Sequence, residues 1–106
     1  MGTQPTSART DPVRVDPKHY TVELENEKVR VLRIKYGPHE KSKMHSHPAL
    51  VGVMLTDCNI RFTYPDGKTE EITAKAGQVV NFPAVDHNPE NLSDRPFEAI
   101  AVELKG

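Results

Sequence analysis

The sequence lacks several features that would point to particular classes of protein. Tryptophan is absent, and cysteine occurs once, at Cys58, so no disulfide can form within the chain. A single cysteine fits a reducing compartment and, inside a strand-like run, predicts a small buried side chain rather than a reactive thiol. No run of about 18 apolar residues occurs, so the sequence predicts no membrane-spanning helix.

Neither sign of charge dominates the sequence. Its 14 basic and 15 acidic residues give a net charge of -1, which leaves no basic field to hold phosphate backbones or anionic lipids. Nucleic acid and membranes are therefore not expected as partners. The first twenty residues contain no apolar stretch of the kind that a signal peptide needs, so we expect a cytoplasmic location.

The chain of 106 residues is long enough for one domain with a single core. Residues 1–17 are rich in Thr, Ser, Asp and Pro and have few apolar side chains, which predicts a flexible N-terminal arm. The remaining residues, 18–106, are expected to form a single β-barrel domain. His19 lies where the arm meets this domain and is expected at the surface.

From Tyr20 onward the sequence shows short apolar runs of period two, separated by turn residues at intervals of about ten residues. This rhythm predicts an all-β sandwich or barrel with little helix. Asp66-Gly67 between two such runs is a strong signal for a β-hairpin. The predicted strands are Tyr20–Leu24, Val29–Tyr36, Leu50–Thr56, Asn59–Tyr64, Thr69–Thr73, Gln78–Phe82 and Phe97–Leu104.

Two histidines separated by one residue, His45 and His47, are the most informative feature of the sequence. Alternate side chains of a β-strand leave the same face, so this spacing aims two imidazoles into one space. We expect His87 to be the third member of the group. Three imidazoles can hold a divalent transition metal and leave coordination positions free for water or substrate.

The histidines and the strand rhythm together resemble a small, single-domain cupin. Cupins carry a first block with a glycine and His-x-His, which Gly37 through Leu55 resembles, and a second block with Pro, His and Asn. Gly77 through Asn91 resembles the second block, with Pro83, His87 and Asn91 in its places. The resemblance implies an all-β, double-stranded β-helix of the cupin jelly-roll type, with the metal inside one mouth, and a homodimer.

The chain departs from the cupin pattern at two points. The family's first block usually has a glutamate ligand four or five residues after the second histidine, where this chain has Val51 and Gly52. The loop expected to present His87 is also one residue shorter and lacks a glycine. The predicted ligand set is therefore His45, His47 and His87, with His39 or Glu40 as a possible additional ligand.

Other side chains are predicted around the metal. Asp86 and Asn91 are the candidates to support the ligands from outside, and Asp86 could orient an imidazole or act as a base. The candidates for the substrate pocket are the larger apolar residues of the predicted barrel. They are Met44, Met54, Phe62, Phe82 and Ile100.

The three-histidine set resembles that of iron-dependent dioxygenases among the cupins. It favours a metal-dependent cupin, an Fe(II) dioxygenase-like oxidoreductase acting on a small anionic or dicarbonyl substrate. Zn, Ni, Mn or Cu could occupy the same imidazoles. Two alternatives stay open: a cupin that binds a small molecule without catalysis, and a Zn-, Ni- or Mn-dependent isomerase, lyase or hydrolase.

Overall fold

The computed structural model describes residues 10–106, which contain nine strands and one short helix. The all-β class predicted from the strand rhythm is confirmed, since helix in these residues is limited to four positions. The elements in chain order are α1 (Pro12–Val15), β1 (Tyr20–Glu25), β2 (Val29–Tyr36), β3 (His45–His47), β4 (Leu50–Met54), β5 (Cys58–Thr63), β6 (Thr69–Ala74), β7 (Val79–Phe82), β8 (Val85–Asn91) and β9 (Phe97–Leu104).

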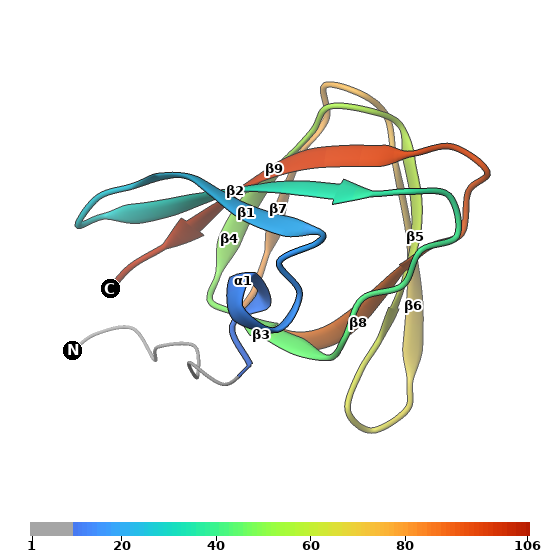
Figure 1. Ribbon diagram of the computed structural model, residues 1–106, viewed down its shortest axis with the longest axis horizontal. Helices are drawn as coiled ribbons and strands as arrows, with labels where there is room; N and C mark the ends of the chain where they lie inside the picture. Colours follow the sequence, from blue (N-terminus) through green and yellow to red (C-terminus); the bar gives the residue numbers. More distant parts are fainter. Residues whose placement is uncertain (1–9) are drawn as a thin grey trace.

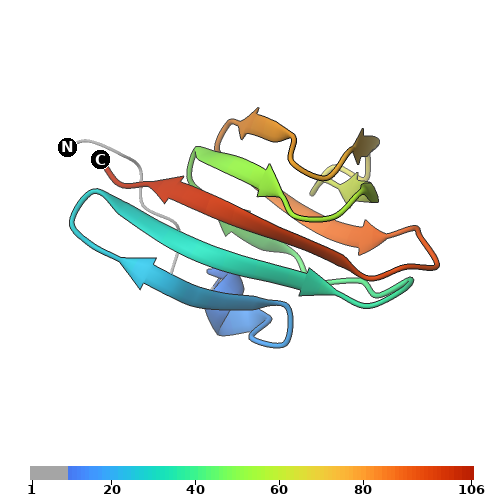
Figure 2. The ribbon, with the colours of Figure 1, turned by 90° about the horizontal axis from the view of Figure 1, so that it is seen from above.

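The strands form two antiparallel sheets, one ordered β1-β2-β9-β4-β7 and the other β3-β8-β5-β6. Figure 1 shows these sheets curving round a common interior, and Figure 2 shows β2 and β9 as long neighbouring strands of the larger sheet. Chain neighbours such as β3 and β4 lie in different sheets, so the chain alternates between the two walls. This arrangement is the expected double-stranded β-helix.

The core follows the alternation of side chains along the strands. In β9, Phe97, Ala99, Ala101 and Glu103 are all buried, whereas the residues between them are more exposed. Cys58, at the start of β5, is buried as predicted, and this burial raises the pKa of its thiol. Apolar side chains therefore share the interior with a set of buried polar side chains, of which Glu103 is one.

The predicted hairpin at Asp66-Gly67 is confirmed. It joins β5 to β6, whose residues pair from Cys58 opposite Ala74 to Thr63 opposite Thr69. Gly67 has a φ of 88°, a conformation that side chains disfavour. The Asp66 carboxylate accepts a hydrogen bond from the backbone N–H of Lys68, which closes the turn.

The set of predicted strands omitted β3 and β8, and His87 lies on a strand rather than on the expected loop. β8 reads Val-Asp-His-Asn-Pro-Glu-Asn, which is polar and contains a proline, both typical of loops. It is nevertheless a strand because His87, Pro89 and Asn91 alternate into the interior. The amide of Asn91 replaces apolar packing with hydrogen bonds to backbone groups in the nearby loops.

Residues 1–9 of the predicted arm lie outside the described residues. Residues 10–17 include α1 and are packed on the barrel rather than free, with Pro12 and Asp16 buried. Val13 packs against the apolar core, and Asp16 accepts hydrogen bonds from Ser42 and His19 in the domain. Sequence composition does not report such contacts and so gave no sign of this anchoring.

Candidate metal centre

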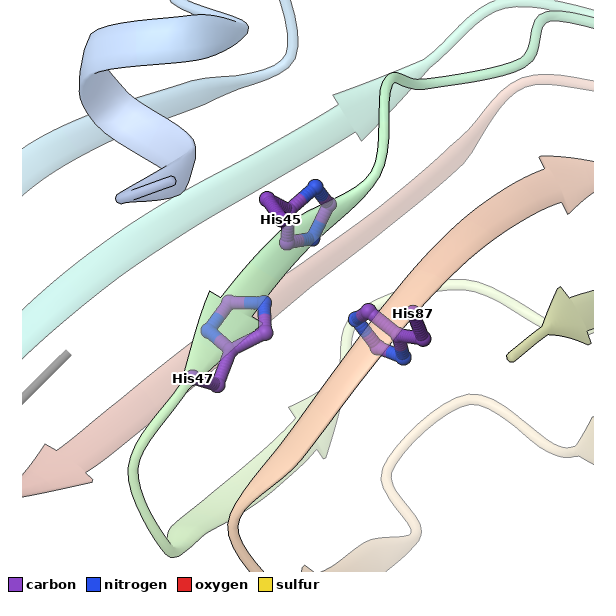
Figure 3. Close-up of side chains that lie close together, drawn as sticks. All are labelled: His45, His47 and His87. Atoms are coloured by element: carbon purple, nitrogen blue, oxygen red, sulfur yellow. The ribbon is translucent and has the colours of Figure 1, made fainter. Parts of the chain in front are cut away.

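Two neighbouring strands bring the three histidines together. His45 and His47 point from β3, and His87 points from β8 at the position directly opposite His45. Figure 3 shows the three rings turned toward one another, and their ring centres lie 4.8 to 5.2 Å apart. One nitrogen of each ring falls in a group whose members lie within 4.8 Å of one another.

Several ring nitrogens of this cluster are buried without partners. Nε2 of His45 and both nitrogens of His87 make no hydrogen bond within the described chain. A buried polar atom without a partner costs free energy, so several in one place require an explanation. Lone pairs of neutral imidazoles are ligands for divalent transition metals, so the residues present fit a metal ion.

Burial keeps two of the imidazoles neutral. Loss of solvation, followed by the proximity of His47, lowers the pKa of His45 to about 4. The same effects, with His45 also close, lower the pKa of His87 to about 2. Neutral imidazole is the form that binds metal, so at pH 7 these two ligands need to lose no proton.

This burial predicts that the metal-free protein loses stability in mild acid. The unfolded chain takes up protons near the usual histidine pKa of 6.5, whereas the folded protein takes them up only near pH 4 and below. The free energy of unfolding should therefore be fully retained above pH 6.5 and should fall below it. The slope is at most about 1.4 kcal/mol per pH unit for each imidazole.

Thermal melts in the presence of a chelator, from pH 7.5 to 4.5, measure this dependence. Val79→Thr provides the control, since it changes an exposed side chain that takes up no proton and should leave the slope unchanged. His87→Gln should make the slope shallower. Equal slopes for wild type and His87→Gln would show that His87 does not resist protonation in the folded protein.

His47 is held by a buried carboxylate that the sequence analysis missed. Nδ1 of His47 donates to Oε2 of Glu103 at 2.7 Å, and Glu103 is 3% exposed. The Nε of Arg30 donates to the other oxygen of Glu103 at 2.9 Å. A carboxylate that accepts from Nδ1 leaves Nε2 to bind a metal. The available signal was the inward position of Glu103 in the alternation of β9.

The possible additional ligands lie away from the cluster. His39 is exposed and pairs with Asp94 through its Nε2, at 2.6 Å. Glu40 binds Lys18, His19 and the backbone N–H of Gly37, and these contacts lower its pKa to about 2. Among residues 10–106 no carboxylate joins the three histidines.

His19 was expected at the surface, and this prediction is wrong. It is 5% exposed, it stacks on Tyr36, and its two ring nitrogens face carboxylate oxygens of Asp16 and Glu40. The packed residues 10–17 cover it, which the prediction of a free arm did not allow.

Asp86 and Asn91 do not support the ligands directly. Asp86 is exposed and accepts a hydrogen bond from Ser46, because residues adjacent to inward-facing histidines point outward. Asn91 is 1% exposed and ties down the loops around Gly37 and Arg95. Its role in the structure is to hold those loops.

An apolar cavity of about 70 Å³ lies beside His47 and His87. Four of the residues predicted for the pocket line it, namely Met54, Phe62, Phe82 and Ile100. Met44 does not, since it precedes His45 and is 38% exposed. Tyr20 and Tyr36 also line the cavity, and the sequence analysis missed both. Their hydroxyl oxygens lie 2.6 Å from each other.

Solved structures of other proteins share this fold. A cupin domain from Bordetella pertussis Tohama I has 24% sequence identity and a TM-score of 0.76, and the match covers 100% of this chain and 99% of that one. A Cupin 2 conserved barrel domain protein from Salinispora arenicola has 21% identity and a TM-score of 0.62, with 100% and 90% covered. A Bacillus subtilis oxalate decarboxylase with Mn(II) centres has 19% identity and a TM-score of 0.58, with 74% and 22% covered.

No curated protein matches the sequence. Within the part of the chain that the structure describes, no helix has the length and apolar character needed to cross a membrane.

The sequence pattern of the cupin domain matches residues 32–103, well over half of the chain, and this stretch contains all three histidines of the cluster. The chain therefore belongs to the cupin domain family.

Proposed function

We propose that the protein is a metal-dependent cupin enzyme, an Fe(II) dioxygenase-like oxidoreductase that acts on a small anionic or dicarbonyl compound. The observation that carries this proposal is the cluster of three buried histidines, which no carboxylate of residues 10–106 joins, at the wall of an apolar cavity. When bound, iron would supply redox chemistry with dioxygen at open coordination positions. The protein itself would supply three neutral imidazole ligands and an apolar cavity beside them.

The charge of the site favours an anionic substrate. Neutral imidazoles leave the full charge of a divalent ion uncompensated, and Glu103 is paired with Arg30 on the far side of His47. The apolar lining strengthens the attraction between opposite charges because it excludes water. An enolate, thiolate or carboxylate bound at the metal would restore neutrality.

Tyr20 and Tyr36 offer the cavity a hydrogen-bond donor. Burial raises the pKa of both phenols well above the usual value of 10, so both are protonated at neutral pH. One hydroxyl donates to the other, so one O–H of the pair is left for a further acceptor, which is either Ser42 beside Tyr36 or a ligand in the cavity. Tyr20 also packs against His45 and His47, so this donor lies close to the metal ligands.

The dimensions of the cavity favour a compact substrate. A volume of about 70 Å³ admits a ligand of few non-hydrogen atoms. A second, larger hollow of about 440 Å³ shares Phe62, Ile72, Phe82 and Val85 with the cavity. We propose that substrate enters past these side chains, since they line both the cavity and the larger hollow.

Oxygen uptake tests the proposal. Protein loaded with Fe(II) should consume dioxygen with at least one member of a panel of small β-diketones and thiols, whereas zinc-loaded protein should not. Turnover without dioxygen would instead indicate an isomerase, lyase or hydrolase. A ligand that raises the melting temperature without turnover would indicate a binding protein, and either result would overturn the proposal.

A further inference from the structure

The residues that precede the matched cupin domain contact the metal centre. Here the N-terminal segment means residues 10–19, which lie outside the matched range of 32–103. β3, which carries His45 and His47, is an edge strand of its sheet. The backbone N–H of Ser46, between the two histidines, donates to the carbonyl of Thr10 at 2.9 Å. The N-terminal segment therefore covers the open edge of the strand that carries two of the three ligands.

Asp16 of the N-terminal segment connects to His45 through Ser42. The Ser42 hydroxyl donates to Oδ2 of Asp16 at 2.6 Å, and both residues are buried. Because its proton is committed to Asp16, the Ser42 oxygen can only accept from Nδ1 of His45, which lies 3.2 Å away. The carbonyl of Lys43 accepts from the same nitrogen at 2.8 Å. Asp16 thereby favours the tautomer of His45 that keeps the proton on Nδ1 and the lone pair on Nε2.

Asp11 of the N-terminal segment connects to His47 through Arg30 and Glu103. The guanidinium of Arg30 binds both carboxylate oxygens of Asp11 through Nη1 and Nη2. Its Nε donates to Glu103, which accepts from Nδ1 of His47. Asp11 thus fixes the plane of the guanidinium that holds the Glu103 carboxylate in place.

We propose that the N-terminal segment is a functional part of the metal centre, in which Asp16 and Asp11 are positioning residues for the ligands His45 and His47. Figure 3 shows α1 beside the strand that carries these two histidines. Two separate chains of hydrogen bonds run from this segment to Nδ1 of the two ligands, and both leave Nε2 free for the metal. The proposal rests on the metal binding assumed in the proposed function, but not on any particular reaction.

The test measures zinc affinity by competition with a chelator, in protein whose metal-free fold has been checked by denaturation. Asp16→Asn and Asp11→Asn should each weaken zinc binding by about 10- to 100-fold. They should also change the visible spectrum of the cobalt-substituted protein, which reports ligand geometry. Asp94→Asn is the matched control, since it alters an exposed aspartate–histidine pair away from the site and should change neither result.

A second variant keeps the proposal falsifiable if an aspartate variant fails to fold. Ser42→Ala removes only the oxygen that joins Asp16 to His45, and it should weaken zinc binding in the same range. Affinities within twofold of wild type for the variants that fold would overturn the proposal. If wild type binds neither zinc nor cobalt, the proposed function fails first, so the two failures can be distinguished.

Discussion

Replacing His45 and His47 together by alanine should abolish the binding of divalent transition metals. The two side chains supply two of the three buried imidazoles, and His87 alone would remain as a ligand. One neutral imidazole cannot hold an ion against water, since stable protein sites use three or four ligands. Wild-type protein purified without added metal should contain iron or another transition metal in near-stoichiometric amount.

Plasma mass spectrometry of the purified proteins measures this difference. His39→Ala is the matched control, because the His39 side chain is exposed and pairs with Asp94 away from the three histidines. It should retain the wild-type metal content. Equal metal in the double variant, or no metal in wild type even after reconstitution, would refute the metal centre.

Metal binding should also raise the stability of wild type. A ligand that binds only the folded state stabilises it by about 4 kcal/mol at a thousandfold excess over its dissociation constant. The melting temperature of wild type should therefore rise on metal addition, and that of the double variant should not.

Replacing Glu103 by alanine should destabilise the metal-free protein by about 3 kcal/mol or more. Its carboxylate is buried, and it accepts hydrogen bonds from both Arg30 and His47. Removing it leaves a donor of His47 without a partner and leaves the Arg30 guanidinium with Asp11 alone. The side chain of Arg30 is 18% exposed, so water can replace part of its lost hydrogen bonding. The expected loss of stability therefore lies near the lower end of the roughly 3 to 5 kcal/mol that is typical for breaking a buried ion pair.

Urea denaturation in the presence of a chelator measures this loss. Glu98→Ala is the matched control, because Glu98 lies on the same strand and pairs with Arg33 in a partly exposed position. An ion pair that solvent reaches in this way contributes about 0 to 1 kcal/mol. Similar losses for the two variants would mean that the buried carboxylate has no special role in stability.

The sequence predicted the features that depend on local pattern. Period-two alternation located seven of the nine strands, and Asp66-Gly67 located the turn between β5 and β6. Alternation also placed His45 and His47 on one face of a strand. It failed for β8, because Pro89 and the polar residues around it are typical of loops, and here hydrogen bonds from Asn91 take the place of apolar packing.

The tertiary structure decided which side chains support the candidate metal ligands. Glu103 lies 56 positions from His47, and Asp16 lies 26 positions from Ser42, so no local pattern connects them. Asp86, a neighbour of His87 in sequence, points away from it because adjacent side chains of a strand leave opposite faces. The order of residues along each strand thus determined which side chains face inward. Only the pairing of distant strands decided which of those inward side chains meet, because contacts across a barrel depend on register and sheet order rather than on distance along the chain.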